Sequence, residues 1–237
     1  MIFKDFLRLI ITFVYPNTCL GCGDIIDEGE YFCDCCFEEL QRIDLDKQCI
    51  KCGLPKGKCD CRKKVYSFDS ITAPFYNKDG AQKAMYAYKF RRRKYISAFF
   101  AQQMALNFKY VYSDIHFDGI CYVPLSGKSY RKRGFNQSRE IAVKMSEILK
   151  IPIVENALGC EKKRKSQHKV GAGKREENVK GKYYPIKQLS GRILLVDDIK
   201  TTGATLNECA KQLLSGGATS VCCITGLITY NTDKKKV

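Results

Sequence analysis

Two adjacent carboxylates followed by a turn of small hydroxyl residues are the part of this sequence best suited to chemistry. Asp197 and Asp198 come directly after an apolar run at residues 193–196. The turn that follows them contains Thr201, Thr202, Gly203, Ala204 and Thr205. The free backbone N–H groups of such a turn, at the start of a helix, bind a phosphate group, and carboxylates accept hydrogen bonds from ribose hydroxyls. The pattern therefore predicts a site for a sugar phosphate.

The elements on either side of the turn support this interpretation. The apolar run has the length and composition of a strand that is buried on both faces and ends at the acidic pair. Apolar residues at helical spacing follow the turn, and Gly216 and Gly217 end them. A nucleoside triphosphatase would need a Gly-x4-Gly-Lys-Ser/Thr loop, which the sequence lacks. A receiver domain would need more chain after the acidic pair. An ordinary strand with a solvated acidic pair and a threonine cap remains the alternative.

A cysteine-rich head predicts bound metal. Nine of the fourteen cysteines lie between Cys19 and Cys61, mostly in C-x2-C pairs whose thiolates can close a tetrahedral zinc site. Disulfides fit less well, because the count is odd and the cysteines come in pairs. The predicted ligands are Cys19, Cys22, Cys33 and Cys36 for a first zinc, and Cys49, Cys52, Cys59 and Cys61 for a second. The second set contains a less usual C-x-C half, so the sequence indicates one or two zinc ions. The role of Cys35 stays open.

The charge of the chain favours a polyanionic partner. The 237 residues carry 41 Lys plus Arg against 25 Asp plus Glu, a formal net charge of +16. This indicates nucleic acid or a phosphorylated substrate, or a surface that is basic throughout. Lys89 opens a basic run at residues 89–94 that includes Phe90, and Lys128, Arg131 and Arg133 lie in a second basic stretch. No apolar run is long enough to span a membrane, so we expect a cytoplasmic protein without a transmembrane segment.

Short strands that alternate with helices predict an α/β fold with a parallel sheet. We expect strands at residues 119–123, near 153–160, at 192–196 and at 220–228, with a helix from Gln137 to Leu149. Earlier helices are expected from Ala81 to Tyr88 and from Ile96 to Val111. Three candidate anion-binding loops, after Val123, Cys160 and Val196, would then meet at the carboxyl ends of the strands.

The basic segment at residues 160–182 has no apolar period and is therefore predicted to be a long loop. It is either a disordered segment or a functional lid. Its most informative polar residues are Arg164, Gln167, Arg175 and Asn178.

Several of these motifs together resemble the ComF family of phosphoribosyltransferase-like proteins. The resemblance covers nearly the whole chain. It rests on the cysteine head, on Arg-Gly-Phe-Asn-Gln at residues 133–137, and on Leu-Val-Asp-Asp at residues 195–198 followed by the turn at residues 201–205. It implies a type I phosphoribosyltransferase-like parallel sheet core with an N-terminal cysteine-rich zinc-binding head. The expected division is a double-zinc-ribbon-like head with a short N-terminal helix at residues 1–64, and a phosphoribosyltransferase-like domain at residues 65–237.

The resemblance also implies roles for individual residues. Asp197 and Asp198, the candidate catalytic residues, would hold the ribose hydroxyls of phosphoribosyl pyrophosphate (PRPP), and residues 201–205 would bind its 5′-phosphate. The pyrophosphate, bridged to the ribose by Mg²⁺, would face Lys128, Arg131, Arg133 and Lys89. Two functions then follow. One is a phosphoribosyltransferase of DNA uptake, with PRPP or a related ribose phosphate as ligand and an unnamed acceptor. The other is a non-catalytic protein that handles single-stranded DNA together with DNA-uptake proteins.

Overall fold

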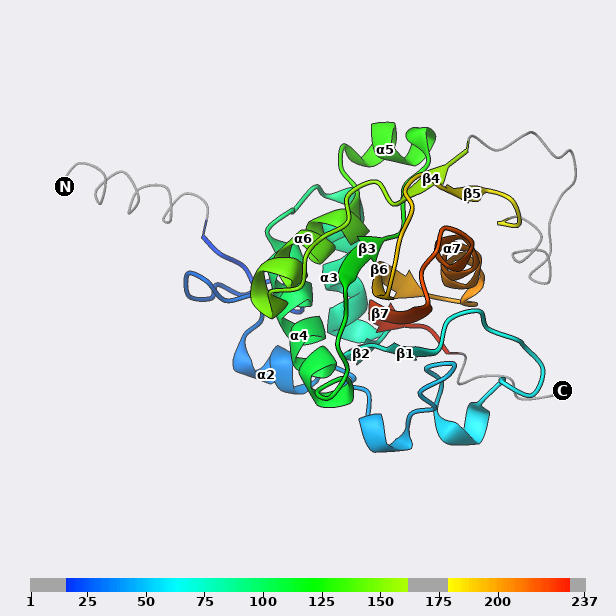
Figure 1. The fold of residues 1–237 in the computed structure, drawn as a ribbon. Coiled ribbons are helices and arrows are strands. Elements are labelled where there is room, and N and C mark those ends of the chain that lie inside the picture. The colour runs from blue at the N-terminus through cyan, green and yellow to red at the C-terminus, as the bar shows by residue number, and fades with distance from the viewer. Residues whose placement is uncertain (1–15, 162–178, 231–237) are drawn as a thin grey trace, which may run out of the picture.

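The computed structural model describes residues 16–161 and 179–230, which form a parallel sheet with helices on both faces and a cysteine-rich head (Figure 1). The sheet follows the order β1-β7-β6-β3, and β2 also pairs with β7; every pairing is parallel. Its strands are β1 (Ser70–Thr72), β2 (Phe75–Tyr76), β3 (Gly119–Tyr122), β6 (Arg192–Lys200) and β7 (Ser220–Ile228). The α/β fold class predicted from the sequence is confirmed.

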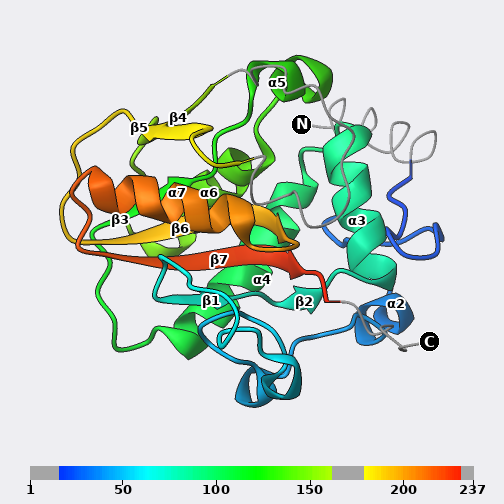
Figure 2. The same cartoon turned by 90° about the vertical axis from the view of Figure 1, so that its right-hand side faces the viewer.

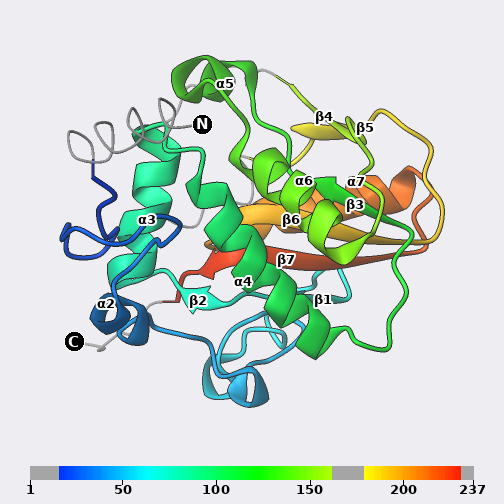
Figure 3. The same ribbon diagram turned by 90° about the vertical axis from the view of Figure 1, so that its left-hand side faces the viewer.

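Helices bury both faces of the sheet, which explains why its central strands are apolar almost throughout. On β6, Leu194 and Val196 face one core while Ile193 and Leu195 face the other. The first core lies under α3 (Asp79–Phe90), α4 (Ile96–Val111) and α6 (Gln137–Leu149) (Figure 3). The second lies under α7 (Ala204–Ser215), which is on the opposite face (Figure 2). These helices confirm the predicted ones.

The predicted end of the central strand is wrong. β6 does not stop at Val196 but pairs with β7 as far as Lys200, which lies opposite Ile228. Asp197 and Asp198 therefore belong to the strand, and Asp197 lies opposite Thr225. The acidic pair interrupts the apolar pattern, but the backbone hydrogen bonds to β7 continue past it.

The predicted strand near residues 153–160 is only partly correct. Ile153 forms a single parallel bridge with Ile120, and a turn at Glu155 and Asn156 then takes the chain away from the sheet. Asn156 adopts a positive φ of 54° in that turn. β4 (Leu158–Cys160) pairs antiparallel with β5 (Tyr183–Pro185) in a separate hairpin. The loop after Cys160 therefore leaves from this hairpin and not from a strand of the parallel sheet. Its start still lies near the turn that follows β6, because Cys160 pairs with Tyr183, whose side chain interacts with Thr205.

The second basic stretch is a short helix rather than a loop. α5 (Gly127–Arg133) begins at Ser126, whose side chain accepts a hydrogen bond from the Ser129 N–H, and it ends at Gly134 with φ of 81°. Three basic residues in its last turn interact favourably with the negative end of the helix. Its cations are therefore held on one short helix.

The head contacts the α/β domain at several places. It contains α2 (Asp34–Glu38) and two 3₁₀ turns at Leu45–Lys47 and Lys56–Lys58. Lys83 on α3 donates a hydrogen bond to the Gly21 carbonyl at 3.0 Å, and the Ile71 N–H on β1 donates to the Ile50 carbonyl at 2.7 Å. Across the described residues, no helix has the length and apolarity needed to cross a membrane.

Candidate functional site

Asp197 on β6 lies beyond the last paired residue of the neighbouring strand β3, next to the start of helix α6. β3 pairs with β6 only as far as Tyr122, opposite Val196. Past that point the first turn of α6 lies beside β6, and the Ser138 hydroxyl donates a hydrogen bond to Asp197 Oδ1 at 2.8 Å. The Asp198 N–H donates to the same oxygen at 2.9 Å. The carboxylate of Asp197 is thus fixed by α6 and by its own strand, and the residue is only 7% exposed.

Asp198 points to the other face of the sheet and has a different partner. The Lys89 ammonium on α3 lies 2.7 Å from Asp198 Oδ1, and the two side chains are only 13% and 11% exposed. The family resemblance implies that Lys89 faces the pyrophosphate together with the cations of residues 128–133. The structure places it in a buried ion pair, so in this state Lys89 neutralises Asp198.

The surroundings of Asp197 make its carboxyl group a weaker acid than usual. Burial, reinforced by the charge of Asp198, raises the pKa of Asp197 from 3.8 to about 7, although the Ser138 hydrogen bond and the charge of Lys89 oppose the change. A buried carboxylate without a full counter-charge is unfavourable, and any ligand that donates hydrogen bonds or brings positive charge relieves that cost. Binding of such a ligand beside Asp197 is therefore favourable.

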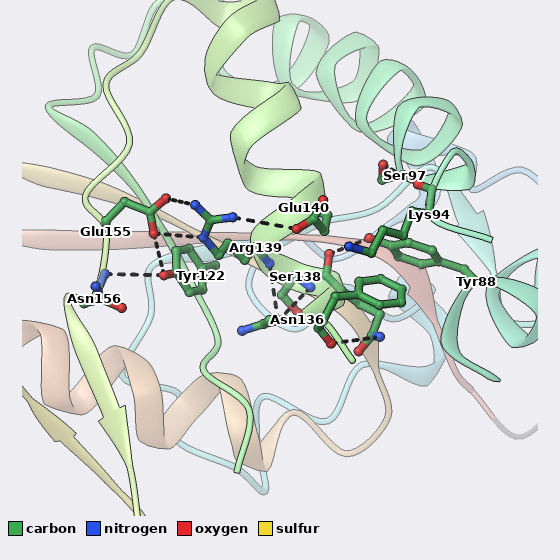
Figure 4. Close-up of polar contacts among 12 residues, drawn as sticks. Tyr88, Lys94, Ser97, Tyr122, Asn136, Ser138, Arg139, Glu140, Glu155 and Asn156 are labelled. Atoms are coloured by element: carbon green, nitrogen blue, oxygen red, sulfur yellow. Dashed lines mark hydrogen bonds and ion pairs between the residues drawn. The ribbon is translucent and has the colours of Figure 1, made fainter. Parts of the chain in front are cut away.

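Asn136, in the segment Arg-Gly-Phe-Asn-Gln, holds the start of α6 in position (Figure 4). Asn136 caps the helix, because its Oδ1 accepts from the N–H groups of Ser138 and Arg139 at 3.0 and 3.3 Å. Its Nδ2 donates to the Val123 carbonyl at the end of β3, at 3.1 Å. Asn136 thus ties the end of β3 to the start of α6. Sequence reasoning missed Ser138, which is only 3% exposed, because no local pattern relates it to Asp197.

The turn at residues 201–205 leads into α7 as predicted. Gly203 precedes the helix with φ of 82°, and the Thr202 Oγ1 accepts from the Ala204 N–H at 3.3 Å. A cavity of about 590 Å³ opens beside this turn. Its charged lining residues are Lys63, Lys64, Lys180, Lys211 and Glu208. Cations outnumber acids around the positive end of the helix, and such a lining favours an anion.

A hydrogen-bonded group at the carboxyl end of β3 was not anticipated from the sequence (Figure 4). Arg139 binds Glu155 through two nitrogens, at 2.5 and 3.1 Å, and the Tyr122 hydroxyl donates to Glu155 at 2.7 Å. The hydrogen bonds from Arg139 hold the pKa of Glu155 below its usual value, although burial opposes the shift. These residues line a second cavity of about 440 Å³, together with Tyr130 of α5. No periodicity relates positions so far apart in the sequence.

The remaining predicted cations are divided between two places. Lys128 and Arg131 are exposed on α5, whereas the Arg133 guanidinium lies 5.5 Å from the Phe90 ring centroid and donates to Gln137 Oε1 at 2.8 Å. Since Phe90 follows Lys89, the end of α5 lies close to the end of α3. The loop residues Arg164, Gln167, Arg175 and Asn178 lie outside the described residues, and their prediction stays untested.

The head contains two groups of four cysteines, each suited to one zinc ion. The first group is Cys19, Cys22, Cys33 and Cys36, and the second is Cys49, Cys52, Cys59 and Cys61. Within each group the Sγ atoms lie within 4.8 Å of one another, which suits four thiolates around one tetrahedral ion. The C-x-C pair therefore joins the second group despite its unusual spacing, and Cys35 belongs to neither.

Known proteins resemble both parts of the chain. The family model "Double zinc ribbon domain" matches residues 10–67, so the head is a double zinc ribbon. "DNA utilization protein YhgH" of Escherichia coli K12 is 27% identical over 217 residues, 87% of this chain and 94% of that protein. "Competence protein F" of Haemophilus influenzae is 27% identical over 86% of each chain. "Competence protein ComFC" of Bacillus subtilis is 29% identical over 81% of this chain and 82% of its own.

The fold and these relatives together identify the class of protein. It is an α/β protein with a parallel sheet and a double zinc-ribbon head. It belongs to the ComF family, as the sequence motifs predicted. A solved hypoxanthine-guanine phosphoribosyltransferase from Schistosoma mansoni, in complex with IMP, covers 58% of this chain and 67% of its own at 11% identity, with a TM-score of 0.29.

Proposed function

We propose that the carboxyl end of β6 and the turn before α7 bind PRPP together with Mg²⁺. The observation that carries this proposal is the pair of buried carboxylates directly before a phosphate-type turn at the positive end of a helix. Asp197 and Asp198 accept hydrogen bonds from the ribose hydroxyls. The 5′-phosphate binds the N–H groups of residues 201–205, next to the lysine-lined cavity.

The ion pair between Lys89 and Asp198 gives this site a way to respond to the ligand. Once ribose hydroxyls donate to Asp198, the nearby Lys89 ammonium can turn to the pyrophosphate, where Lys128, Arg131 and Arg133 supply further positive charge. The oxygen donors of Asp197 and Asp198 fit Mg²⁺, which prefers carboxylates and phosphates. When bound, Mg²⁺ supplies charge neutralisation for the pyrophosphate.

The activity that follows from this site is transfer of the phosphoribosyl group. The bond from the anomeric carbon to the pyrophosphate oxygen breaks, and a bond to the acceptor forms. The two carboxylates stabilise the positive charge that develops on the sugar, and the cations of α3 and α5 stabilise the leaving pyrophosphate. We further propose that the chain divides into a zinc-binding head at residues 1–64 and a catalytic domain at residues 65–237. We also propose that the protein is cytoplasmic and acts in DNA uptake.

A second candidate function is binding of single-stranded DNA without turnover. It is favoured by exposed aromatic residues among cations where α3 ends. Tyr86, Phe90 and Tyr95 are 57%, 46% and 51% exposed, and a basic run follows Phe90. Aromatic rings and cations together bind single strands by stacking and by charge. The names of the relatives, with "DNA utilization" and "competence", support a role in DNA handling for either candidate.

Titration calorimetry with Mg-PRPP tests the first candidate. We expect the double variant Asp197→Asn/Asp198→Asn to bind at least about tenfold more weakly, because each charged hydrogen bond contributes about 1.5–3 kcal/mol. Asp114→Asn, an exposed aspartate, is the matched control and should bind like the unmodified protein. Equal affinity in all three proteins would remove the proposed site.

Fluorescence anisotropy with an oligo-dT probe separates the two candidates. If the double variant loses Mg-PRPP but keeps its affinity for oligo-dT and its DNA uptake, the transferase is not the biological role. Neutralising Arg91, Arg92, Arg93 and Lys94 should flatten the salt dependence of oligo-dT binding, because fewer counterions are released. An unchanged slope would exclude this run from the DNA surface.

A further inference from the structure

The two zinc groups of the head pack against different parts of the α/β domain. Cys19 and Cys36 of the first group contact the core under α3 and α4. Cys52 of the second group is fully buried in the core under α7, and Cys49 and Cys61 pack against that core. The second group is therefore on the same side of the sheet as the helix that follows the phosphate-type turn (Figure 2).

A short segment connects the second zinc group directly to this turn. Asp60 lies between the ligands Cys59 and Cys61, and the Tyr66 hydroxyl donates to both of its carboxylate oxygens at 3.1 Å. The Tyr66 ring lies against Gly203, since a Cβ placed on that glycine would come within 3.2 Å of Tyr66 Cε1. Tyr66 is thus held by a residue between two zinc ligands and in turn packs against the turn.

A second contact ties the same segment to the first turn of α7. The Ser67 N–H donates to Asn207 Oδ1 at 2.5 Å. Lys63, Lys64 and Tyr66 form one wall of the cavity of about 590 Å³, and Thr202, Gly203 and Asn207 form another. The cavity beside the turn is therefore built jointly by the zinc head and by α7.

A buried lysine adds an electrostatic connection. Lys200 ends β6 directly before Thr201 and is only 2% exposed. Its Cε lies 3.3 Å from the Cβ position of Gly203. The charges of Asp60, Cys52 and Cys61 stabilise its ammonium, and the charge of Lys64 opposes them. Four thiolates around one Zn²⁺ carry a net negative charge. The loaded second group thus supplies counter-charge to a buried cation next to the turn.

We propose that the second zinc group is a positioning element for the turn at residues 201–205, acting through Asp60, Tyr66 and Lys200. Metal at this group and a phosphorylated ligand at the turn are then thermodynamically coupled, so each strengthens binding of the other by the same factor. The coupling to a phosphorylated ligand rests on the proposed function. The positioning of the turn by the second zinc group, which is the structural half of the proposal, does not rest on it and is tested separately.

Amide hydrogen exchange of a peptide covering residues 201–208 tests the structural half without any ligand. We expect faster exchange there in Cys61→Ser, which disrupts the second group, and in Tyr66→Phe, which keeps the ring but loses the bond to Asp60. The matched control Cys22→Ser disrupts the first group and should leave this peptide unchanged. If Cys61→Ser does not fold, Tyr66→Phe alone decides. Unchanged exchange in Tyr66→Phe, or an equal increase in Cys22→Ser, would overturn the proposal.

Zinc release to a chromogenic chelator tests the coupling itself. Mg-PRPP should slow release from the second group by about 5- to 150-fold, the usual range of coupling between two sites. In Cys61→Ser, which retains only the first group, the release rate should not change, and this also controls for zinc binding by PRPP. Identical rates with and without a saturating ligand would refute the coupling. If Mg-PRPP does not bind the intact protein, the proposed function fails while the exchange result still stands.

Discussion

The buried carboxylate of Asp197 should reduce the stability of the ligand-free protein above neutral pH. Its folded-state pKa of about 7 lies above the ordinary value of 3.8, because the side chain is buried beside Asp198. Between these two values the folded protein binds more protons at this group than the unfolded chain does. The free energy of unfolding therefore falls as the pH rises through this window and becomes constant above it.

The size of the effect follows from the pKa change. Each pKa unit corresponds to about 1.4 kcal/mol, so the group lowers the free energy of unfolding by at most about 4 kcal/mol once it is fully ionised. Thiolate–zinc sites release metal in acid, so the useful range is pH 6 to 8.5. Over that range we expect a loss of about 1 kcal/mol from this one group.

Asp197→Asn should remove this loss while keeping an oxygen that can accept from Ser138. Urea denaturation with saturating zinc, at pH 6 and at pH 8.5, measures it. The variant should gain stability relative to the unmodified protein by about 1 kcal/mol more at pH 8.5 than at pH 6. Asp114→Asn should show no such difference. Parallel pH profiles for Asp197→Asn and the unmodified protein would refute the electrostatic argument.

Three further substitutions or measurements test other parts of the site. Ser138→Ala removes the buried hydroxyl that donates to Asp197 Oδ1 and should lower the unfolding free energy by about 1–3 kcal/mol in urea denaturation; an unchanged midpoint would contradict the assigned contact. Gly203→Ala places a Cβ against Tyr66 at a positive φ and should destabilise by about 1–3 kcal/mol, whereas Gly57→Ala, which has open space, should not; equal effects would argue against strain. Elemental analysis should find two zinc ions per chain, one in Cys22→Ser or Cys61→Ser, and two in Cys35→Ser; a single ion in the unmodified protein would remove one group.

The sequence predicted the elements that depend on local pattern. The apolar spacing on α3, α4 and α6 determined those helices, because each buries one regular face. The acidic pair and its turn were found because strand, loop and helix are consecutive there. The expected site residues stay predictions as to function, since their placement alone does not identify a ligand.

The sequence could not predict the partners that come from distant elements. Ser138 and Lys89 reach the acidic pair only after α6 and α3 pack on the sheet. The strand beyond Val196 was missed because its backbone bonds to β7 do not depend on side-chain polarity. The β4 hairpin was misplaced because a short apolar run does not reveal which strand it pairs with. The contact of Tyr66 with Gly203 is likewise a product of tertiary packing.

A structure of the protein with Mg-PRPP bound is the most direct test of the proposed site. We predict ribose hydroxyls within hydrogen-bond distance of Asp197 and Asp198, the 5′-phosphate on the N–H groups of residues 201–205, and Lys89 turned from Asp198 toward the pyrophosphate. A ligand bound elsewhere, with the ion pair between Lys89 and Asp198 intact, would contradict the account.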